Sequence, residues 1–221
     1  MGTPSTKVIV AGGSVGGFGR FPDRGVADLA APVLADALAA AGLEPSDIQA
    51  AFVGNAFGGM LQHQAEGRSV FMDVNAERAI RYMDAYGATP RHFALCAAKN
   101  RAHAALNDRA AVRDPIDVEA VLADKVVIGP LTRAMCGGIA DGAAAVLLVS
   151  EAFARARGLG GPRVAASAVA TGISEGGQPN ATARAGALAY AMAGVGPEDI
   201  GVAEVHDPTA PQEMFDIEDL G

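Results

Sequence analysis

Residues 41–53 and 193–205 carry nearly the same thirteen-residue sequence twice. Seven positions are identical without a gap, in the order Ala, Gly, Pro, Asp, Ile, Ala and Val. Each copy follows an alanine-rich stretch with helical periodicity and leads into a short apolar stretch typical of a strand. Internal repetition of this kind predicts a duplicated scaffold. The residues after the two copies differ: Gly54-Asn55 follows the first and His206-Asp207 follows the second. Because only the second pair is ionisable, we expect chemistry at the second strand end.

The composition predicts a folded core and excludes some classes of protein. Half of the 221 residues are hydrophobic and 19% are charged, which favours a packed core over disorder. The net charge of −8 argues against nucleic acid as a partner. No apolar run is long enough to cross a bilayer, and no basic-then-apolar leader precedes Lys7. The two cysteines form no disulfide framework, so we expect a cytoplasmic protein.

The periodicity predicts two β-α-β units. The first comprises a strand over residues 7–11, a glycine-rich loop over 12–19, a helix over 28–41 and a strand over 50–53. The second comprises a strand over 163–170, a helix over 182–193 and a strand over 202–205. The apolar run 143–149 is expected to be a strand covered on both faces, followed by a helix over 151–157. An acidic, helix-like segment covers 212–220.

The middle of the chain is of another kind. Helical patterns cover residues 71–86, 94–100 and 118–123, with starts at Thr89-Pro90 and Asp117. Residues 68–133 carry a net charge of +2, whereas the remainder carries −10. This segment is either a basic face for an anionic ligand or a solvated helical surface. We therefore divide the chain into a first half (1–67), a helical insertion (68–140), a closing strand and helix (141–158) and a partial second half (159–221).

Three motifs are candidates for chemistry. The glycines from Gly12 to Gly19 follow a strand, as in dinucleotide-binding folds, but their spacing is poor and no acidic residue closes the next strand. A dinucleotide-binding oxidoreductase is therefore a weak alternative to a simple turn. Cys136 has no histidine close in sequence and Cys96 sits within the helical pattern 94–100, so we expect both thiols to be buried and inert. No spacing predicts a metal site.

His206 is the strongest candidate. It ends an apolar segment, stands beside Asp207 and precedes a proline-containing stretch that cannot continue a central strand. Functional groups often stand at strand carboxyl ends in α/β folds. An imidazole there can donate to a carbonyl oxygen or move a proton, although a structural role is equally open.

Several strings together resemble the thiolase superfamily, nearest to the sterol-carrier-protein-type thiolases and bacterial acetyl-CoA acetyltransferase-like proteins. They are Glu204-Val205-His206-Asp207, the block from Cys136 to Ala145, Lys99-Asn100 with His103 and Leu106-Asn107, and Gly54 to Gly59. The resemblance implies an α/β fold of duplicated β-α-β halves with a helical loop domain that contacts coenzyme A. It also implies Claisen condensation or thiolysis of a 3-ketoacyl-CoA through an acyl-cysteine. His206 matches a residue of the oxyanion hole or of proton handling.

The sequence also departs from this family. Residues 60–67 run almost directly into the loop-domain pattern, where the family's nucleophilic cysteine segment would stand. The sequence stops before the family's Gly-His-Pro segment and second cysteine. We therefore expect an internally deleted and C-terminally short member, incomplete relative to the family, that is inactive in thiolysis by itself.

The resemblance implies no permanently bound cofactor, and a coenzyme A thioester as the substrate. Incomplete halves would leave sheet edges unpaired, so we expect a homo-oligomer or a complex with a thiolase-like or small acyl-CoA-binding partner. A non-catalytic subunit that binds coenzyme A or a partner is the alternative to an acyltransferase.

Overall fold

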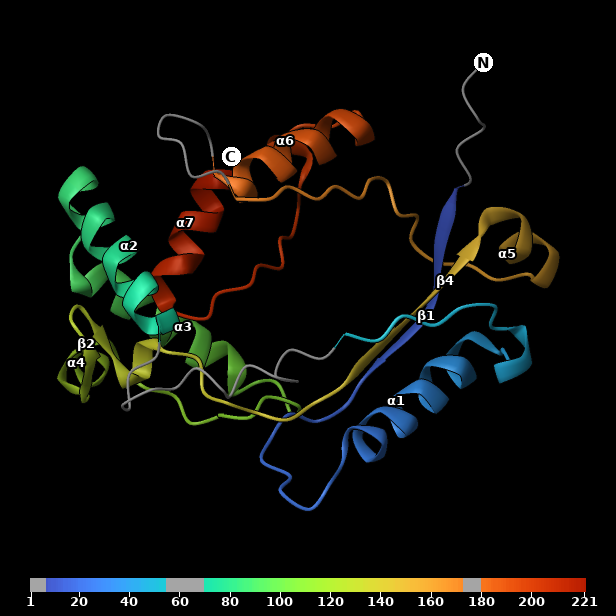
Figure 1. Cartoon of the computed structure of the whole chain (residues 1–221), viewed down its shortest axis with the longest axis horizontal. Coiled ribbons are helices and arrows are strands. Elements are labelled where there is room, and N and C mark those ends of the chain that lie inside the picture. The colour runs from blue at the N-terminus through green and yellow to red at the C-terminus, as the bar shows by residue number, and fades with distance from the viewer. Residues whose placement is uncertain (1–6, 55–69, 173–179) are drawn as a thin grey trace. The chain divides into compact units, whose positions relative to one another are not determined.

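The computed structural model describes residues 7–54, 70–172 and 180–221 of the chain (Figure 1). Its residues form two compact units. The first unit combines residues up to 52 with 109–111 and 140–167, and the second combines 53–108, 112–139 and 168–221. Each unit draws on distant parts of the sequence. The family-like string after Gly54 and the expected site of the deletion, residues 60–67, lie outside the described residues.

The first unit is built on a two-stranded antiparallel sheet. Strand β1 (Val8–Val15) pairs with β4 (Ala144–Ser150), with an irregularity between Val10 and Gly12. Helix α1 (Val26–Ala41) packs on both strands, and α5 (Glu151–Arg157) follows β4 (Figure 1). The helix buries Val33, Ala37 and Ala41, which recur at helical spacing.

The close packing of α1 on the sheet explains Gly12. A Cβ atom at this position would lie 2.9 Å from the carbonyl oxygen of Ala37, closer than side chains approach backbone. Gly12 therefore permits a helix to lie directly on the strand. The strand continues through Gly12 to Val15, so the predicted glycine-rich loop over 12–19 is wrong in its first four residues. This packing role accounts for Gly12 without any phosphate.

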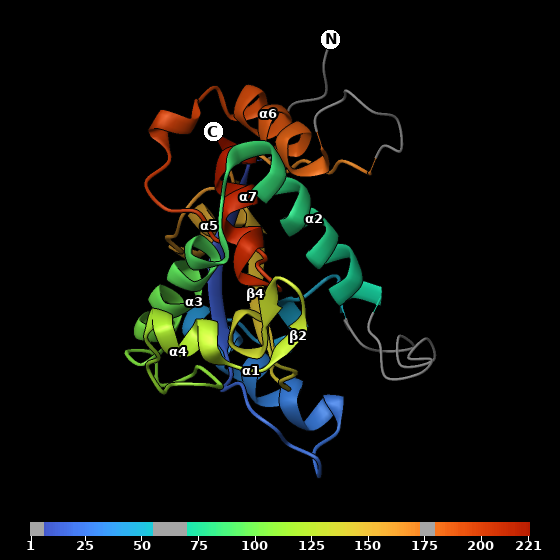
Figure 2. The ribbon, with the colours of Figure 1, turned by 90° about the vertical axis from the view of Figure 1, so that its left-hand side faces the viewer.

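The second unit consists mainly of helices. It contains α2 (Val70–Tyr86), α3 (Pro90–Ala104), α4 (Val118–Ala123), α6 (Ala181–Ala193) and α7 (Ala210–Leu220), with the short strands β2 (Val126–Ile128) and β3 (Leu131–Thr132). The helix starts predicted at Pro90 and after Asp117 are confirmed, and the Asp117 carboxylate accepts a hydrogen bond of 2.7 Å from the Ala120 amide. Figure 2 shows α7 beside α3, in agreement with the contacts between them.

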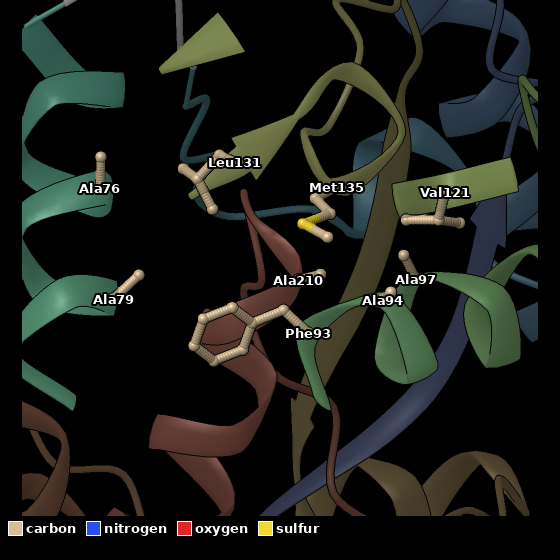
Figure 3. Packing of buried hydrophobic residues seen from close by; sticks show 9 residues of the cluster. All are labelled: Ala76, Ala79, Phe93, Ala94, Ala97, Val121, Leu131, Met135 and Ala210. Atoms are coloured by element: carbon tan, nitrogen blue, oxygen red, sulfur yellow. The ribbon is translucent and has the colours of Figure 1, made fainter. Parts of the chain in front are cut away.

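A small apolar core joins α2, α3, α4 and the start of α7 (Figure 3). Phe93 is fully buried, and alanines from α2 and α3 allow the helices to approach it closely. The remaining members are Val121, Leu131, Met135 and Ala210. The core thereby ties α4, the β2–β3 region and the start of α7 to the helical segment.

The two copies of the repeat adopt the same local conformation. Helices α1 and α6 each end at a glycine in the left-handed region, Gly42 with φ 62° and Gly194 with φ 72°. Each is followed by a 3₁₀ turn that starts with proline, at Pro45–Asp47 and Pro197–Asp199. The Asp side chain of each turn accepts a hydrogen bond from the amide three residues earlier, at 3.1 Å and 3.0 Å. The predicted duplication is thus present in these helix-and-turn elements.

Several predicted strands are not formed. Residues 50–53 and 202–205 belong to no strand, and 163–170 contributes only an isolated bridge between Ile9 and Arg163. Phe52 is 97% exposed and Val202 is 81% exposed. Strand 143–149 was expected to be covered on both faces, yet Val146 is 62% exposed. An apolar segment becomes a strand only when a partner exchanges backbone hydrogen bonds along it. Around Arg163 this exchange with β1 is limited to two bonds, from Val10 to Pro162 and from Val164 to Val8.

Candidate functional site

His206 lies on a segment that leads into α7. Residues 202–206 form neither helix nor strand, Pro208 and Thr209 follow, and α7 begins at Ala210 with a proline in its first turn. Proline in the first turn costs no backbone hydrogen bond, and it fixes where the helix starts. His206 is exposed, whereas Thr209 and the first turn of α7 are buried. The segment that carries His206 is therefore anchored at its carboxyl side.

A pocket of about 620 Å³, largely open to solvent, lies beside His206 within the second unit. This volume falls in the range of about 300–1,000 Å³ that is usual for small-molecule sites. One part of its lining is polar and comprises Asn75, Arg78, Glu204, His206, Gln212 and Asp216. The other part is apolar or small and comprises Ala168, Ala185, Gly186, Ala189, Val205 and Leu220. The pocket can therefore hold a ligand with an apolar part and a polar, hydrogen-bonding part.

The polar lining is itself ordered by hydrogen bonds between α2 and α7. The Arg78 guanidinium donates to the Gln212 side-chain oxygen at 2.6 Å, and the Gln212 amide donates to Asp216 at 2.7 Å. Arg78 also lies 5.2 Å from the centre of the Phe215 ring. Because Gln212 and Asp216 are buried, these bonds satisfy groups that would otherwise be costly. Arg78 supplies a positive charge to the pocket wall.

Asp207 belongs to a second polar cluster. Its carboxylate accepts a hydrogen bond of 3.1 Å from the side-chain amide of Asn100 on α3. The same amide nitrogen donates to Glu213 of α7 at 2.9 Å, and Glu213 also pairs with Lys99. Burial raises the pKa of Asp207 above its ordinary value, and the nearby Glu213 charge adds to this, against the opposing effects of its own backbone amide and Lys99.

Both cysteines of the chain are half-buried thiols. Cys136 donates to the Thr132 carbonyl oxygen at 3.4 Å, and burial raises the pKa of this thiol. Burial also raises the pKa of Cys96, with a further contribution from Glu213. A raised pKa disfavours the thiolate, which is the nucleophilic form of cysteine. The backbone around Cys136 pairs with the segment after His206, through the Gly137 amide and the Pro208 oxygen at 2.8 Å.

The structure thus divides the predicted motif. His206 lines a pocket, whereas Asp207 is held by α3 and α7. The sequence singled out the Lys99-Asn100 pair without predicting a role for it, and it did not point to Glu213. The local sequence carries little signal for this cluster, because Asn100 is 107 residues from Asp207 and 113 residues from Glu213 along the chain.

The described part of the chain contains neither a metal-binding cluster nor a helix that could span a membrane. Residues 7–54, 70–172 and 180–221 contain no group of three His, Cys, Asp or Glu side chains arranged to hold a metal ion. Within those same ranges, every helix is too short or too polar to cross a bilayer.

The sequence is similar to a thiolase domain family, to a thiolase subunit and to an acetyl-CoA acetyltransferase. Residues 175–221 match the family described as thiolase C-terminal domain-like. The chain is 39% identical over 153 residues to benzoylsuccinyl-CoA thiolase subunit BbsB of Thauera aromatica, covering 66% of this chain and 40% of that protein. It is 34% identical over 164 residues to acetyl-CoA acetyltransferase of Methanothermobacter thermautotrophicus, covering 72% and 43%. The chain therefore spans about two fifths of the length of these relatives.

The fold comparison covers nearly the whole chain. The solved structure of the Ltp2-ChsH2(DUF35) aldolase superposes with a TM-score of 0.80 and 23% identity, over 98% of this chain and 77% of that one. A likeness at this identity concerns the fold. The shared fold covers residues of both units of the chain.

Proposed function

This chain belongs to the thiolase superfamily, and from that premise we propose that it handles a coenzyme A thioester at the pocket beside His206. The observation that carries the proposal is the position of His206 at a pocket with both a polar and an apolar lining. The apolar part suits an acyl chain, and the polar part suits the thioester and its neighbourhood. The thioester is the substrate, and the proposal requires no permanently bound cofactor.

His206 would act on the thioester oxygen. In Claisen condensation and in thiolysis, this carbonyl oxygen gains negative charge as the nucleophile attacks. An N–H donor aimed at the developing charge stabilises the transition state more than the substrate. The imidazole of His206 can supply that donor, or can carry a proton between the reacting groups. Arg78 adds a positive charge to the same pocket, which the carboxylates of Glu204 and Asp216 also line.

We further propose that this chain alone does not perform thiolysis. Acyl transfer through an acyl-cysteine needs a thiolate, and the raised pKa values of Cys96 and Cys136 disfavour one. Neither thiol lines the pocket beside His206. A reactive cysteine would then have to come from another polypeptide or from further sequence.

Incubation of the purified chain with acetoacetyl-CoA and coenzyme A tests both statements. We expect no loss of acetoacetyl-CoA and no acylated cysteine by intact-mass spectrometry. We also expect calorimetric binding of acetyl-CoA that weakens in His206→Ala, by about tenfold for one lost hydrogen bond to a polar group. His103→Ala, at an exposed position on α3, is the matched control. Turnover through an acyl-cysteine would refute the inactivity, and equal binding by all three proteins would refute the role of His206.

A non-catalytic subunit is the second candidate. The relative from Thauera aromatica is described as a thiolase subunit, and the aldolase of the solved structure is named for two components, Ltp2 and ChsH2(DUF35). A subunit of this kind would bind acetyl-CoA without turnover and form a stable complex with a complete thiolase or a small acyl-CoA-binding protein. Sedimentation of the chain with each candidate partner tests this, and a chain that stays monomeric and binds no coenzyme A would contradict it.

A parallel NADH titration, expected to show no binding, tests the dinucleotide alternative.

A further inference from the structure

The cluster behind His206 is centred on a single side-chain amide. The Asn100 amide nitrogen carries two hydrogens, and carboxylates from two different elements accept from it. One is Asp207, next to His206 in the sequence, at 3.1 Å. The other is Glu213 on α7, at 2.9 Å. Asn100 therefore joins α3, the segment after the candidate functional residue and the helix that follows.

The carboxylates leave this amide little freedom. Glu213 is 8% exposed, and its second oxygen pairs with Lys99, the residue before Asn100. Glu213 is thus held by two consecutive residues of α3. A buried carboxylate without donors is costly, so the arrangement that satisfies both acids is strongly preferred. Without Asn100, the two neighbouring negative charges would repel each other with no donor between them.

His206 is fixed through the residues that follow it. The Asn100 amide holds the Asp207 side chain, and the Gly137 amide donates to the Pro208 oxygen at 2.8 Å. Proline restricts φ at position 208, which removes another degree of freedom. The His206 side chain is exposed, so packing around its ring does not hold the ring in one orientation. The backbone conformation imposed by Asp207 and Pro208 then sets the direction of the His206 Cα–Cβ bond and limits which rotamers the imidazole can adopt.

We propose that Asn100 is a positioning residue for His206, acting through its hydrogen bond to Asp207. This inference rests on the proposed function of His206 for its importance in binding. Asn100 does not line the pocket and touches no reacting atom in this arrangement. Its effect is to confine His206 to the orientation in which its ring faces the pocket.

A purely structural role is the competing explanation, because the same cluster joins α3 to α7. The two explanations differ in what they predict for His206. A structural role lowers the stability of the second unit and leaves the His206 side chain as it was. A positioning role broadens the set of His206 rotamers even when the fold persists.

Nuclear magnetic resonance on the histidine-labelled full chain separates them. The substitution Asn100→Ala removes both donors and raises helix propensity, so α3 is retained. Arg101→Ala is the control, because it removes a 2.9 Å side-chain hydrogen bond to the Asp114 oxygen from the adjacent helix position. Asn100→Gln keeps both N–H groups on a longer side chain. His206 signals are assigned by their loss in His206→Ala.

We expect the three-bond couplings of His206 to indicate one rotamer in the wild type and in Arg101→Ala, and averaged rotamers in Asn100→Ala. Asn100→Gln should restore part of the wild-type coupling. Acetyl-CoA affinity, measured with free coenzyme A as reference, should fall about tenfold in Asn100→Ala. Unchanged couplings in a folded Asn100→Ala chain would overturn the inference. A wild-type His206 that has one rotamer but does not respond to acetyl-CoA would instead overturn the proposed function.

Discussion

Asp207 is the residue at which burial and charge conflict most clearly. Burial raises its pKa above the ordinary value of 3.8, and the negative charge of Glu213 raises it further. The hydrogen bond from its own backbone amide and the charge of Lys99 act in the opposite direction. A carboxyl group with a raised pKa in the fold ionises less readily there than in the unfolded chain. The free energy of unfolding therefore falls as pH rises from the ordinary pKa through the higher folded value, and this loss persists above it.

The substitution Asp207→Asn should remove this pH dependence. The new amide oxygen can still accept from Asn100, but no charge forms at any pH. We expect the variant to gain stability relative to the wild type as pH rises across that window, with a constant difference above it. Denaturant unfolding at a series of pH values measures the difference. Asp36→Asn, which removes an exposed carboxylate from α1, controls for the loss of charge. A difference that is flat, or that changes in the opposite direction, contradicts the prediction.

At the scale of elements, the repeat makes a paired prediction about helix ends. Gly42 and Gly194 have φ values of 62° and 72°, and a Cβ at either position would meet nothing within 4 Å. Alanine there would suffer conformational strain alone, at a cost of about 1–2 kcal/mol. We expect Gly42→Ala and Gly194→Ala to lower the free energy of unfolding by similar amounts, one in each unit, as measured by urea denaturation.

Gly138 supplies the control for these two glycines. It also has open space around a would-be Cβ, but its φ does not lie in the left-handed region. Gly138→Ala should therefore be neutral or slightly stabilising, because the unfolded chain loses freedom. If all three variants unfold alike, the shared helix ends do not depend on left-handed glycines.

The helices could be predicted from the sequence because their signals are local. The apolar spacing of α1, Pro90 at the start of α3 and the Asp117 cap each lie within a few residues of what they determine. Strands depend on partners elsewhere in the chain, so the apolar segments 50–53 and 202–205 were expected to pair and do not. The same reason hid the link from Asn100 to Asp207 and Glu213, whereas His206 could be found from its own neighbours.

At the scale of the whole molecule, both units leave apolar side chains uncovered. In the first unit, Val146 and Leu148 of β4 are 62% and 60% exposed on one side of the sheet. In the second, Leu188 and Met192 of α6 are also exposed. Monomeric proteins rarely expose contiguous apolar patches, and a bare sheet face favours association.

We therefore expect the isolated chain to self-associate through the uncovered side of β4. Burying Val146 and Leu148 in a contact would contribute about 1.5–3 kcal/mol for each side chain, before the cost of association. The double substitution Val146→Lys and Leu148→Lys should shift the chain to a smaller species in sedimentation velocity across a concentration series. Leu106→Lys, at an 87% exposed residue after α3, adds a charge outside β4 and should leave the association unchanged. If the wild type sediments as a monomer at every concentration, or if the control dissociates as much as the double variant, this side of β4 is not the surface through which copies associate.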